Sequence, residues 1–252
     1  MARTRRPAVP WPTILRELTI VGIDDVTATT RRLTLAGDAF GGFVSTGFDD
    51  HVKVLVPVAG QDRPPLPVQG PDRLEWGAAG GRPVAKDYTP RRVTDSTVDL
   101  DFVLHGEGFA SGWAQRASLG DPAWIVGPTR SLQAPPDVDH WLVAGDETAL
   151  PAIARLLDEA PEDLSAHVVI EVPSPASIQP LRDLPGVDVR WVHDTAAWHE
   201  QIATAPLFHD AWPGDRTFCW VAGEAGACRQ ARSVVAARVP RDCLDVTGYW
   251  RR

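Results

Sequence analysis

The sequence contains few cysteines, and their arrangement excludes a cysteine-based scaffold. Only three of the 252 residues are cysteine, Cys219, Cys228 and Cys243, and none is part of a Cys-x-x-Cys pair. An odd number of cysteines without such a pair predicts neither a disulfide framework nor a thiolate metal site. The histidines do not match the spacings of zinc sites either, so we expect no bound metal.

The sequence also lacks a long apolar run and an excess of positive charge. No run approaches the roughly 18–20 apolar residues needed to span a bilayer, so no membrane insertion is expected. The net charge of -8 argues against nucleic acid as a partner. The opening residues 1–6 are basic, but prolines rather than an apolar export segment follow them, which predicts a disordered arm. We expect a cytoplasmic protein that is a monomer.

The first half of the chain is predicted to form β-strands. Apolar and polar residues alternate roughly with a period of two in four short segments, at residues 16–21, 31–35, 51–56 and 97–104. Short strands of this kind favour an antiparallel barrel or sandwich. A Pro/Gly-rich stretch, residues 57–83, separates the third strand from the fourth and shows no clear periodicity.

The second half of the chain alternates between strands and helices. Strands are predicted at residues 141–144, 167–170, 187–192 and 218–222, and helices at 148–159, 195–203 and 225–238. This alternation predicts a parallel sheet covered by helices. With Ala134-Pro135-Pro136 as a linker, we predict two domains, an N-terminal antiparallel β-barrel at residues 13–134 and a C-terminal α/β domain with a parallel sheet at residues 137–252.

Two glycine-containing segments suit a phosphate or ribose, and each also has a purely structural interpretation. Residues 145–151 follow a predicted strand and open a helix, whose exposed N–H groups attract such ligands. A plain helix capped by Thr148 or Asp146 explains the same residues. Residues 106–113 would let a pyrophosphate approach backbone N–H groups closely, although a loop with Ser111 as an N-cap is the alternative.

A third segment, residues 86–91, has the sequence Lys-Asp-Tyr-Thr-Pro-Arg. It combines two cations with an aromatic ring and a hydroxyl group, which are the parts that a flavin nucleotide requires. The alternative is a surface turn with a half-buried tyrosine.

Taken together and in this order, these segments resemble the siderophore-interacting proteins, which are ferric-siderophore reductases in the ferredoxin-reductase-like flavoprotein superfamily. The resemblance spans residues 19–250. Its most specific pieces lie at residues 88–91, 101–106, 110–114, 120–121, 127–128, 144–151, 220–225 and 248–251. Two positions depart from the family: Lys86 stands where an arginine is common, and Phe109 stands where a proline is usual. Lysine keeps the charge but loses the bidentate fork of arginine.

The resemblance implies an FAD site in the first domain. Tyr88 would stack on the isoalloxazine and Thr89 would hydrogen-bond near its N5, which makes these two the catalytic residues. The residues implied to hold the rest of the FAD are Lys86, Arg91, His105, Ala110, Ser111 and Trp113.

The resemblance also implies a nicotinamide-dinucleotide site in the second domain, with NADPH or NADH as electron donor. The resemblance implies that Asp146, Glu147, Thr148 and Ala149 lie at the cofactor junction between the domains. It also implies that Ala222, Gly223 and Glu224 face the nicotinamide and that Tyr249 and Trp250 come back towards the flavin. The habit of the family favours NADPH. Glu171, at the end of the second predicted parallel strand, favours NADH, because a carboxylate there would bind a ribose 2′-hydroxyl and repel a 2′-phosphate.

The implied activity is FAD-dependent reduction of Fe(III) in a ferric siderophore to Fe(II), which releases the metal. Two alternatives stay open: a flavin reductase that serves a protein acceptor, and a non-catalytic carrier of flavin or siderophore. Four arginines are candidates for contact with the siderophore only because they lie in or beside the 57–83 stretch: Arg63, Arg73, Arg82 and Arg92.

Overall fold

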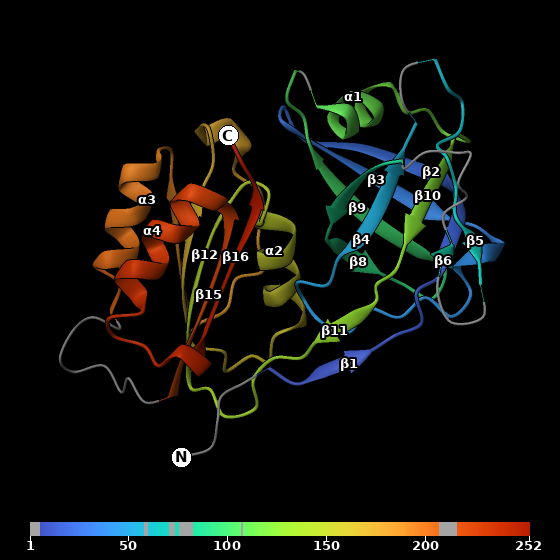
Figure 1. Cartoon of the computed structure of the whole chain (residues 1–252). Helices are drawn as coiled ribbons and strands as arrows, with labels where there is room; N and C mark the ends of the chain where they lie inside the picture. The colour runs from blue at the N-terminus through green and yellow to red at the C-terminus, as the bar shows by residue number, and fades with distance from the viewer. Residues whose placement is uncertain (1–5, 58–59, 71–73, 76–82, 107, 207–215) are drawn as a thin grey trace. The chain divides into compact units, whose positions relative to one another are not determined.

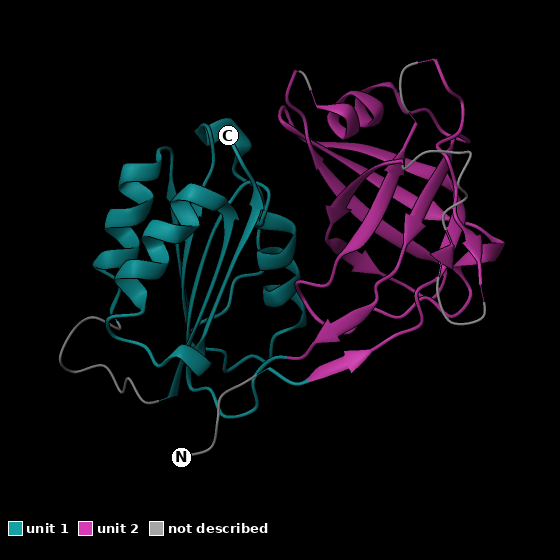
Figure 2. Cartoon of the chain, viewed as in Figure 1, with its two compact units in different colours: residues 1–7, 134–252 teal, residues 8–133 magenta. Residues whose placement is uncertain are grey.

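The computed structural model describes residues 6–57, 60–70, 74–75, 83–106, 108–206 and 216–252. The chain divides into two compact units, shown in Figure 2. One comprises Ala8–Gln133, and the other comprises Ala134–Arg252 together with the described N-terminal residues Arg6 and Pro7. Each unit is described by itself below.

A seven-stranded antiparallel sheet forms the body of the unit Ala8–Gln133 (Figure 1). Its strand order is β7-β4-β10-β2-β3-β9-β8. The strands are β2 (Leu15–Thr27), β3 (Thr30–Ala36), β4 (Val52–Val56), β7 (Val84–Tyr88), β8 (Pro90–Val93), β9 (Thr97–Val103) and β10 (Pro122–Val126). Two small two-stranded antiparallel sheets join β1 (Ala8–Pro10) to β11 (Arg130–Leu132) and β5 (Val68–Gln69) to β6 (Leu74–Glu75). The antiparallel barrel-like fold and all four predicted strands are confirmed.

The inner face of this sheet forms the core of the unit. Every second residue of β9 points inward, so that Val98, Leu100 and Phe102 are fully buried. Helix α1 (Phe109–Arg116) packs against the same cluster through Ala110 and Ala114. The core therefore lies directly beneath α1 and the end of β9.

A five-stranded parallel sheet forms the body of the other unit, in the order β14-β13-β12-β15-β16. Figure 1 shows α2 on one face and α3 and α4 on the other. The strands are β12 (His140–Asp146), β13 (Ala166–Glu171), β14 (Val187–Val192), β15 (Thr217–Glu224) and β16 (Leu244–Trp250). The helices are α2 (Leu150–Glu159), α3 (Thr195–Ala203) and α4 (Ala225–Val235). The predicted parallel sheet covered by helices is confirmed, and it gains β16, which the sequence had not indicated.

Arg6, the last residue of the predicted disordered arm, has a fixed partner. Arg6 is buried, and its Nη1 lies 3.1 Å from Oδ2 of Asp245 on β16. The expectation of a disordered arm is therefore wrong at Arg6, because a distant carboxylate on β16 pairs with this cation; residues 1–5 lie outside the described residues.

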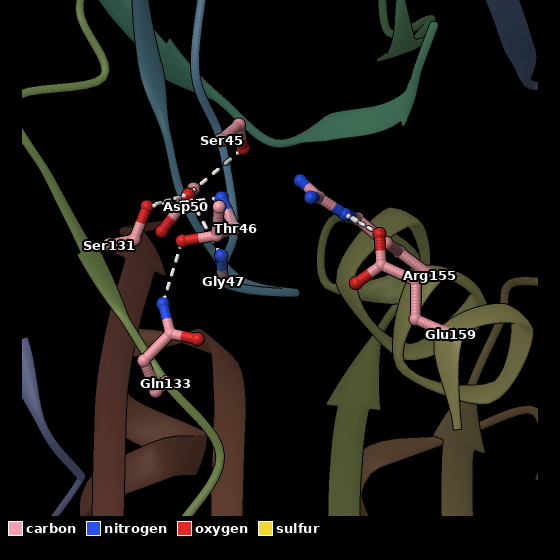
Figure 3. Close-up of polar contacts among 8 residues, drawn as sticks. All are labelled: Ser45, Thr46, Gly47, Asp50, Ser131, Gln133, Arg155 and Glu159. Atoms are coloured by element: carbon pink, nitrogen blue, oxygen red, sulfur yellow. Dashed lines mark hydrogen bonds and ion pairs between the residues drawn. The ribbon is translucent and has the colours of Figure 1, made fainter. Parts of the chain in front are cut away.

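A buried carboxylate ties the β1–β11 pair to the loop before β4 (Figure 3). Asp50 is 3% exposed, and its Oδ2 accepts hydrogen bonds from Ser45 Oγ at 2.9 Å, Gly47 N at 3.1 Å and Ser131 Oγ at 2.5 Å. Ser131 Oγ in turn accepts from Trp11 Nε1 at 2.8 Å. The same view includes the Arg155–Glu159 ion pair of α2 (2.6 Å), which belongs to the other unit.

We expect Asp50→Ala to lower the free energy of unfolding by about 2–4 kcal/mol, because it leaves two buried donors, Gly47 N and Ser131 Oγ, and one half-buried donor without their acceptor. Urea unfolding of the purified protein measures this loss. Asp95→Ala, which removes an exposed carboxylate from the β8–β9 loop, should change the unfolding midpoint little. Equal midpoints for the two variants would show that the network does not stabilise the unit.

Candidate functional site

Tyr88 lies at the point where the chain passes from one edge strand of the antiparallel sheet to the other. Strands β7 and β8 are the two edge strands, and Thr89 alone connects them. The Tyr88 ring packs on Phe102, with centroids 4.2 Å apart and planes inclined by 38°. Phe102 also contacts Trp113 of α1 edge-on at 5.6 Å. The structure thus brings Tyr88 and Trp113 together around a fully buried phenylalanine, which fixes the tyrosine ring in place.

Burial also fixes the chemical state of this tyrosine. It raises the pKa of the Tyr88 hydroxyl well above its usual value, so the group stays neutral at physiological pH. Thr89 beside it is buried as well. The pair therefore offers a flat ring and uncharged polar atoms, not a base or a nucleophile.

The two cations of the segment lie on either side of Tyr88. Lys86 is two residues before Tyr88 on β7, so both side chains leave the same face of the strand, and Lys86 is exposed. Asp87 leaves the opposite face, where it pairs with Lys53 at 2.8 Å. Arg91 falls at a break in the β8–β9 register between Pro90 and Arg92, and an irregularity of this kind redirects a side chain.

The loop before α1 is held in shape by Ser111. Its Oγ accepts from the N–H of His105 at 2.8 Å and donates to the carbonyl of His105 at 2.7 Å. Ser111 and Ala110 are both buried, whereas the His105 ring is exposed. The side chains of Ala110 and Ser111 therefore shape the loop. The groups that these two residues present to a ligand are their backbone N–H groups in the first helical turn.

The N-terminus of α1 has the properties of an anion site. Its N-cap is Gly108, and no described side chain caps the helix there, so the first N–H groups and the positive end of the helix dipole face outward. The other end of α1 is capped by Arg31, whose Nη1 donates to the carbonyls of Ala114 (3.3 Å) and Gln115 (2.9 Å). A fixed aromatic ring, flanking cations and an anion-binding helix end fit the isoalloxazine and pyrophosphate of a flavin dinucleotide.

Ser111→Ala should weaken FAD binding roughly 3- to 10-fold, because the loss of two hydrogen bonds lets the loop before α1 relax. Titration of the apoprotein with FAD measures the change. Ser118→Ala removes an exposed hydroxyl after the same helix and is the matched control. If the two variants bind FAD equally well, the two hydrogen bonds between Ser111 and the backbone of His105 do not shape the site.

A second group of predicted residues gathers at the carboxyl ends of β12, β15 and β16 in the parallel sheet, which we call the carboxyl edge. It comprises Asp146, Glu147, Thr148, Ala149, Ala222, Gly223, Glu224, Tyr249 and Trp250. In open α/β sheets, ligands bind at this end of the strands. The side chains of Ala149 and Ala222 are fully buried, so only their backbone can face a ligand.

Asp146 is the centre of the carboxyl edge. Its Oδ1 accepts from Thr148 N at 2.9 Å and Thr148 Oγ1 at 2.5 Å. Its Oδ2 accepts from Glu224 N at 2.8 Å and Trp250 Nε1 at 2.7 Å. The predicted role of Asp146 or Thr148 as cap of α2 is wrong: Ala149 is the N-cap and receives no side-chain hydrogen bond from the described residues. The carboxylate of Asp146 bonds instead to Thr148 and to residues of β15 and β16.

The other acidic groups of the region are also engaged. The Glu224 side chain caps α4 by accepting from Ala227 N at 2.8 Å, and this hydrogen bond lowers the pKa of Glu224. Glu171 ends β13 and accepts from Thr195 Oγ1 at 2.8 Å. Burial raises the pKa of Glu171.

Some predicted residues stand apart from these groups. Arg63 pairs with Glu17 at 2.5 Å, and Arg92 lies opposite Asp99 on β9, while Arg73 and Arg82 lie outside the described residues. Within the described part of the chain, no group of three His, Cys, Asp or Glu residues is placed to hold a metal ion. None of the helices described is both long and apolar enough to cross a membrane.

Comparisons with known proteins find matches to both units of the chain. Residues 19–132 match the family described as siderophore-interacting FAD-binding domain, and residues 138–252 match the siderophore-interacting protein family. The NADPH-dependent ferric-chelate reductase of Escherichia coli is 32% identical, over 93% of this chain and 92% of that protein.

Solved structures give the same result. A siderophore utilization protein from T. fusca superposes with a TM-score of 0.89 at 32% identity, covering 98% of this chain and 96% of that one. The siderophore-interacting protein SipS from Aeromonas hydrophila gives 0.77 at 28% identity, covering 99% and 100%. Sequence and fold agree over nearly the whole length, and the chain belongs to the siderophore-interacting protein family.

Proposed function

We propose that this protein is an FAD-dependent reductase of ferric siderophores that takes its electrons from NADPH or NADH. The observation that carries the proposal is the Tyr88 ring, which packs on Phe102, the same ring that contacts Trp113 of α1, a helix whose N-terminus no described side chain caps. Membership of the siderophore-interacting protein family supports the same activity, because the relatives include a protein named as a ferric-chelate reductase.

The roles of the residues follow from their placement. When bound, FAD supplies the conversion of two-electron transfer from the nicotinamide into single-electron steps. Tyr88 and Thr89 hold its flat ring and exclude water from one side, without exchanging a proton, since burial keeps Tyr88 neutral. Lys86 and Arg91 would balance the charge of the pyrophosphate, and His105 with the backbone N–H groups of Ala110 and Ser111 would donate hydrogen bonds to it. The siderophore supplies the ligands of the iron, so the reaction requires no metal-binding residues.

The carboxyl edge is the proposed site of the electron donor. Glu147 and Thr148 lie in the turn before α2, and Ala222 to Glu224 end β15 beside it. Glu171 at the end of β13 favours NADH, whereas the E. coli relative is named as NADPH-dependent. Steady-state rates with each dinucleotide and one ferric siderophore distinguish the two donors.

We propose a cytoplasmic location and a monomeric state. The three cysteines are buried and form no disulfide, as is usual in a reducing compartment. Both groups of proposed cofactor residues lie in one chain, so a single copy suffices. Fractionation of cells and light scattering of the purified protein test these two points.

Purification and anaerobic titration test the proposed function. The protein should be yellow, or turn yellow with added FAD, and NADPH or NADH should bleach the flavin absorbance. A protein that takes up no FAD would refute the proposal. A yellow protein that neither dinucleotide bleaches would instead be a non-catalytic flavin or siderophore carrier.

A further inference from the structure

All lone-pair positions of the Asp146 carboxylate are used within its own unit. The group accepts four hydrogen bonds, two on each oxygen, from Thr148, Glu224 and Trp250. An ionised carboxylate has about four such positions. Asp146 therefore has no acceptor position left for a ribose hydroxyl. Its carboxylate acts as an anchor, which means that it holds the groups that donate to it.

The backbone near Asp146 lets the carboxylate come close to the end of β15. Gly223 has a φ of 149°, and a Cβ on it would lie 2.6 Å from Asp146 Oδ2. Only glycine allows the turn at the end of β15 to come so close. The carboxylate thus joins the end of β12 to the ends of both β15 and β16.

Trp250 is the exposed partner in this arrangement. Its indole N–H is fixed at 2.7 Å from Asp146 Oδ2, yet 40% of the residue remains exposed. The Arg252 guanidinium lies 5.9 Å from the centre of the ring. A large ring held by its one polar atom at a ligand-binding edge presents a fixed surface for stacking.

We propose that Asp146 is a positioning residue for the electron donor. It holds the Trp250 indole so that its exposed surface stacks on a planar ring of the nicotinamide dinucleotide. The inference rests on the proposed function, because that function supplies the donor. It changes the role of Asp146 from a direct cofactor contact to a group that acts through Trp250.

Two measurements on FAD-loaded protein test the proposal. The first is the indole ¹H–¹⁵N resonance of Trp250, assigned as the signal that Trp250→Phe removes. In the wild type it should be shifted downfield by the carboxylate and should move when NADP⁺ or NAD⁺ is added. In Asp146→Asn it should lose the downfield shift.

The second measurement is the Kd of NADP⁺ and NAD⁺ by calorimetry. Trp250→Phe keeps a ring but loses the anchor, and both it and Asp146→Asn should raise the Kd roughly 3- to 10-fold. The double variant should bind the dinucleotide no more weakly than the weaker-binding single variant, because both substitutions break the same hydrogen bond between Asp146 and Trp250. Asp139→Asn, at the amino end of the same strand, is the matched control and should bind like the wild type.

Unchanged Kd values in both single variants, with the resonance shift lost, would overturn this inference alone. Trp250→Phe keeps the test valid if Asp146→Asn fails to fold. A wild-type protein that binds neither dinucleotide would overturn the proposed function and this inference with it. The resonance of the free protein would then still report whether Asp146 holds the indole.

Discussion

Tyr88→Ala should yield a folded protein that is purified largely without FAD. The substitution removes the ring that packs on Phe102 at 4.2 Å and leaves the end of β7 without a flat surface. An aromatic stacking pair contributes about 0.5–1.5 kcal/mol beyond the area that it buries. With the lost contact area of the ring included, we expect FAD affinity to fall at least about 10-fold.

The ratio of flavin absorbance to protein absorbance after purification measures this loss, and titration of the apoprotein gives the Kd. Tyr88→Phe is the control, since it keeps the ring and removes only a hydroxyl that stays neutral. It should retain most of the FAD. Full FAD content in Tyr88→Ala would show that the ring is a core residue of the antiparallel unit and not a cofactor surface.

Gly108→Ala should have an effect of similar size by a different route. A Cβ at residue 108 would lie 2.3 Å from Cε1 of the His105 ring, closer than real Cβ contacts. The exposed His105 ring must turn away from the first turn of α1, so that it could no longer donate to an anion held at the N–H groups there. We expect FAD affinity to fall roughly 10-fold or more, since about 1.4 kcal/mol of lost interaction is tenfold in Kd.

Gly106→Ala is the matched control for this second prediction. Apart from its chain neighbours, no described atom lies within 4 Å of the position that a Cβ would take there. Titration of both apoproteins with FAD should separate them clearly. Equal affinities would mean that the arrangement of His105 over Gly108 does not matter for binding.

The sequence predicted the layers of both units because burial leaves a direct pattern in it. Val98, Leu100 and Phe102 alternate along β9, and all three are fully buried on the inner face. The parallel strands around residues 143, 169 and 220 are short, largely apolar segments, and the edge strand around residue 189 alternates between apolar and charged residues. Such patterns are local, so they can be read without knowing which strands pair.

Strands β7 and β8 escaped prediction for a physical reason. The Lys86-Asp87-Tyr88 segment has little apolar alternation, because β7 is an edge strand and much of it is exposed. Pro90 then weakens any expectation of a strand. Pairing with β4, which is distant in sequence, imposes the extended structure on β7, and β8 pairs with β9, the next strand along the chain. The local pattern of residues 86–91 is therefore typical of a surface turn, and only the resemblance to a family indicates a cofactor site there.

The role of Asp146 also depends on contacts between residues that are distant in sequence, so the local sequence does not predict it. Beside a helix start, a carboxylate suggests an N-cap or a ligand for a hydroxyl group. Two of its donors come from Glu224 and Trp250, which are 78 and 104 positions away. No local spacing contains that information, and only the parallel order of β12, β15 and β16 brings these residues together.

The central claim is that electrons from a nicotinamide dinucleotide reach siderophore-bound iron through this protein, and a single-turnover experiment tests it most directly. FAD-loaded protein is bleached anaerobically with one equivalent of NADPH or NADH, then mixed with excess ferric siderophore and a ferrous chelator. We predict that the yellow absorbance returns and that two Fe(II) ions form for each FAD, because the dinucleotide donates two electrons and each Fe(III) accepts one. Absorbance that stays bleached, or that returns without Fe(II), would contradict the account.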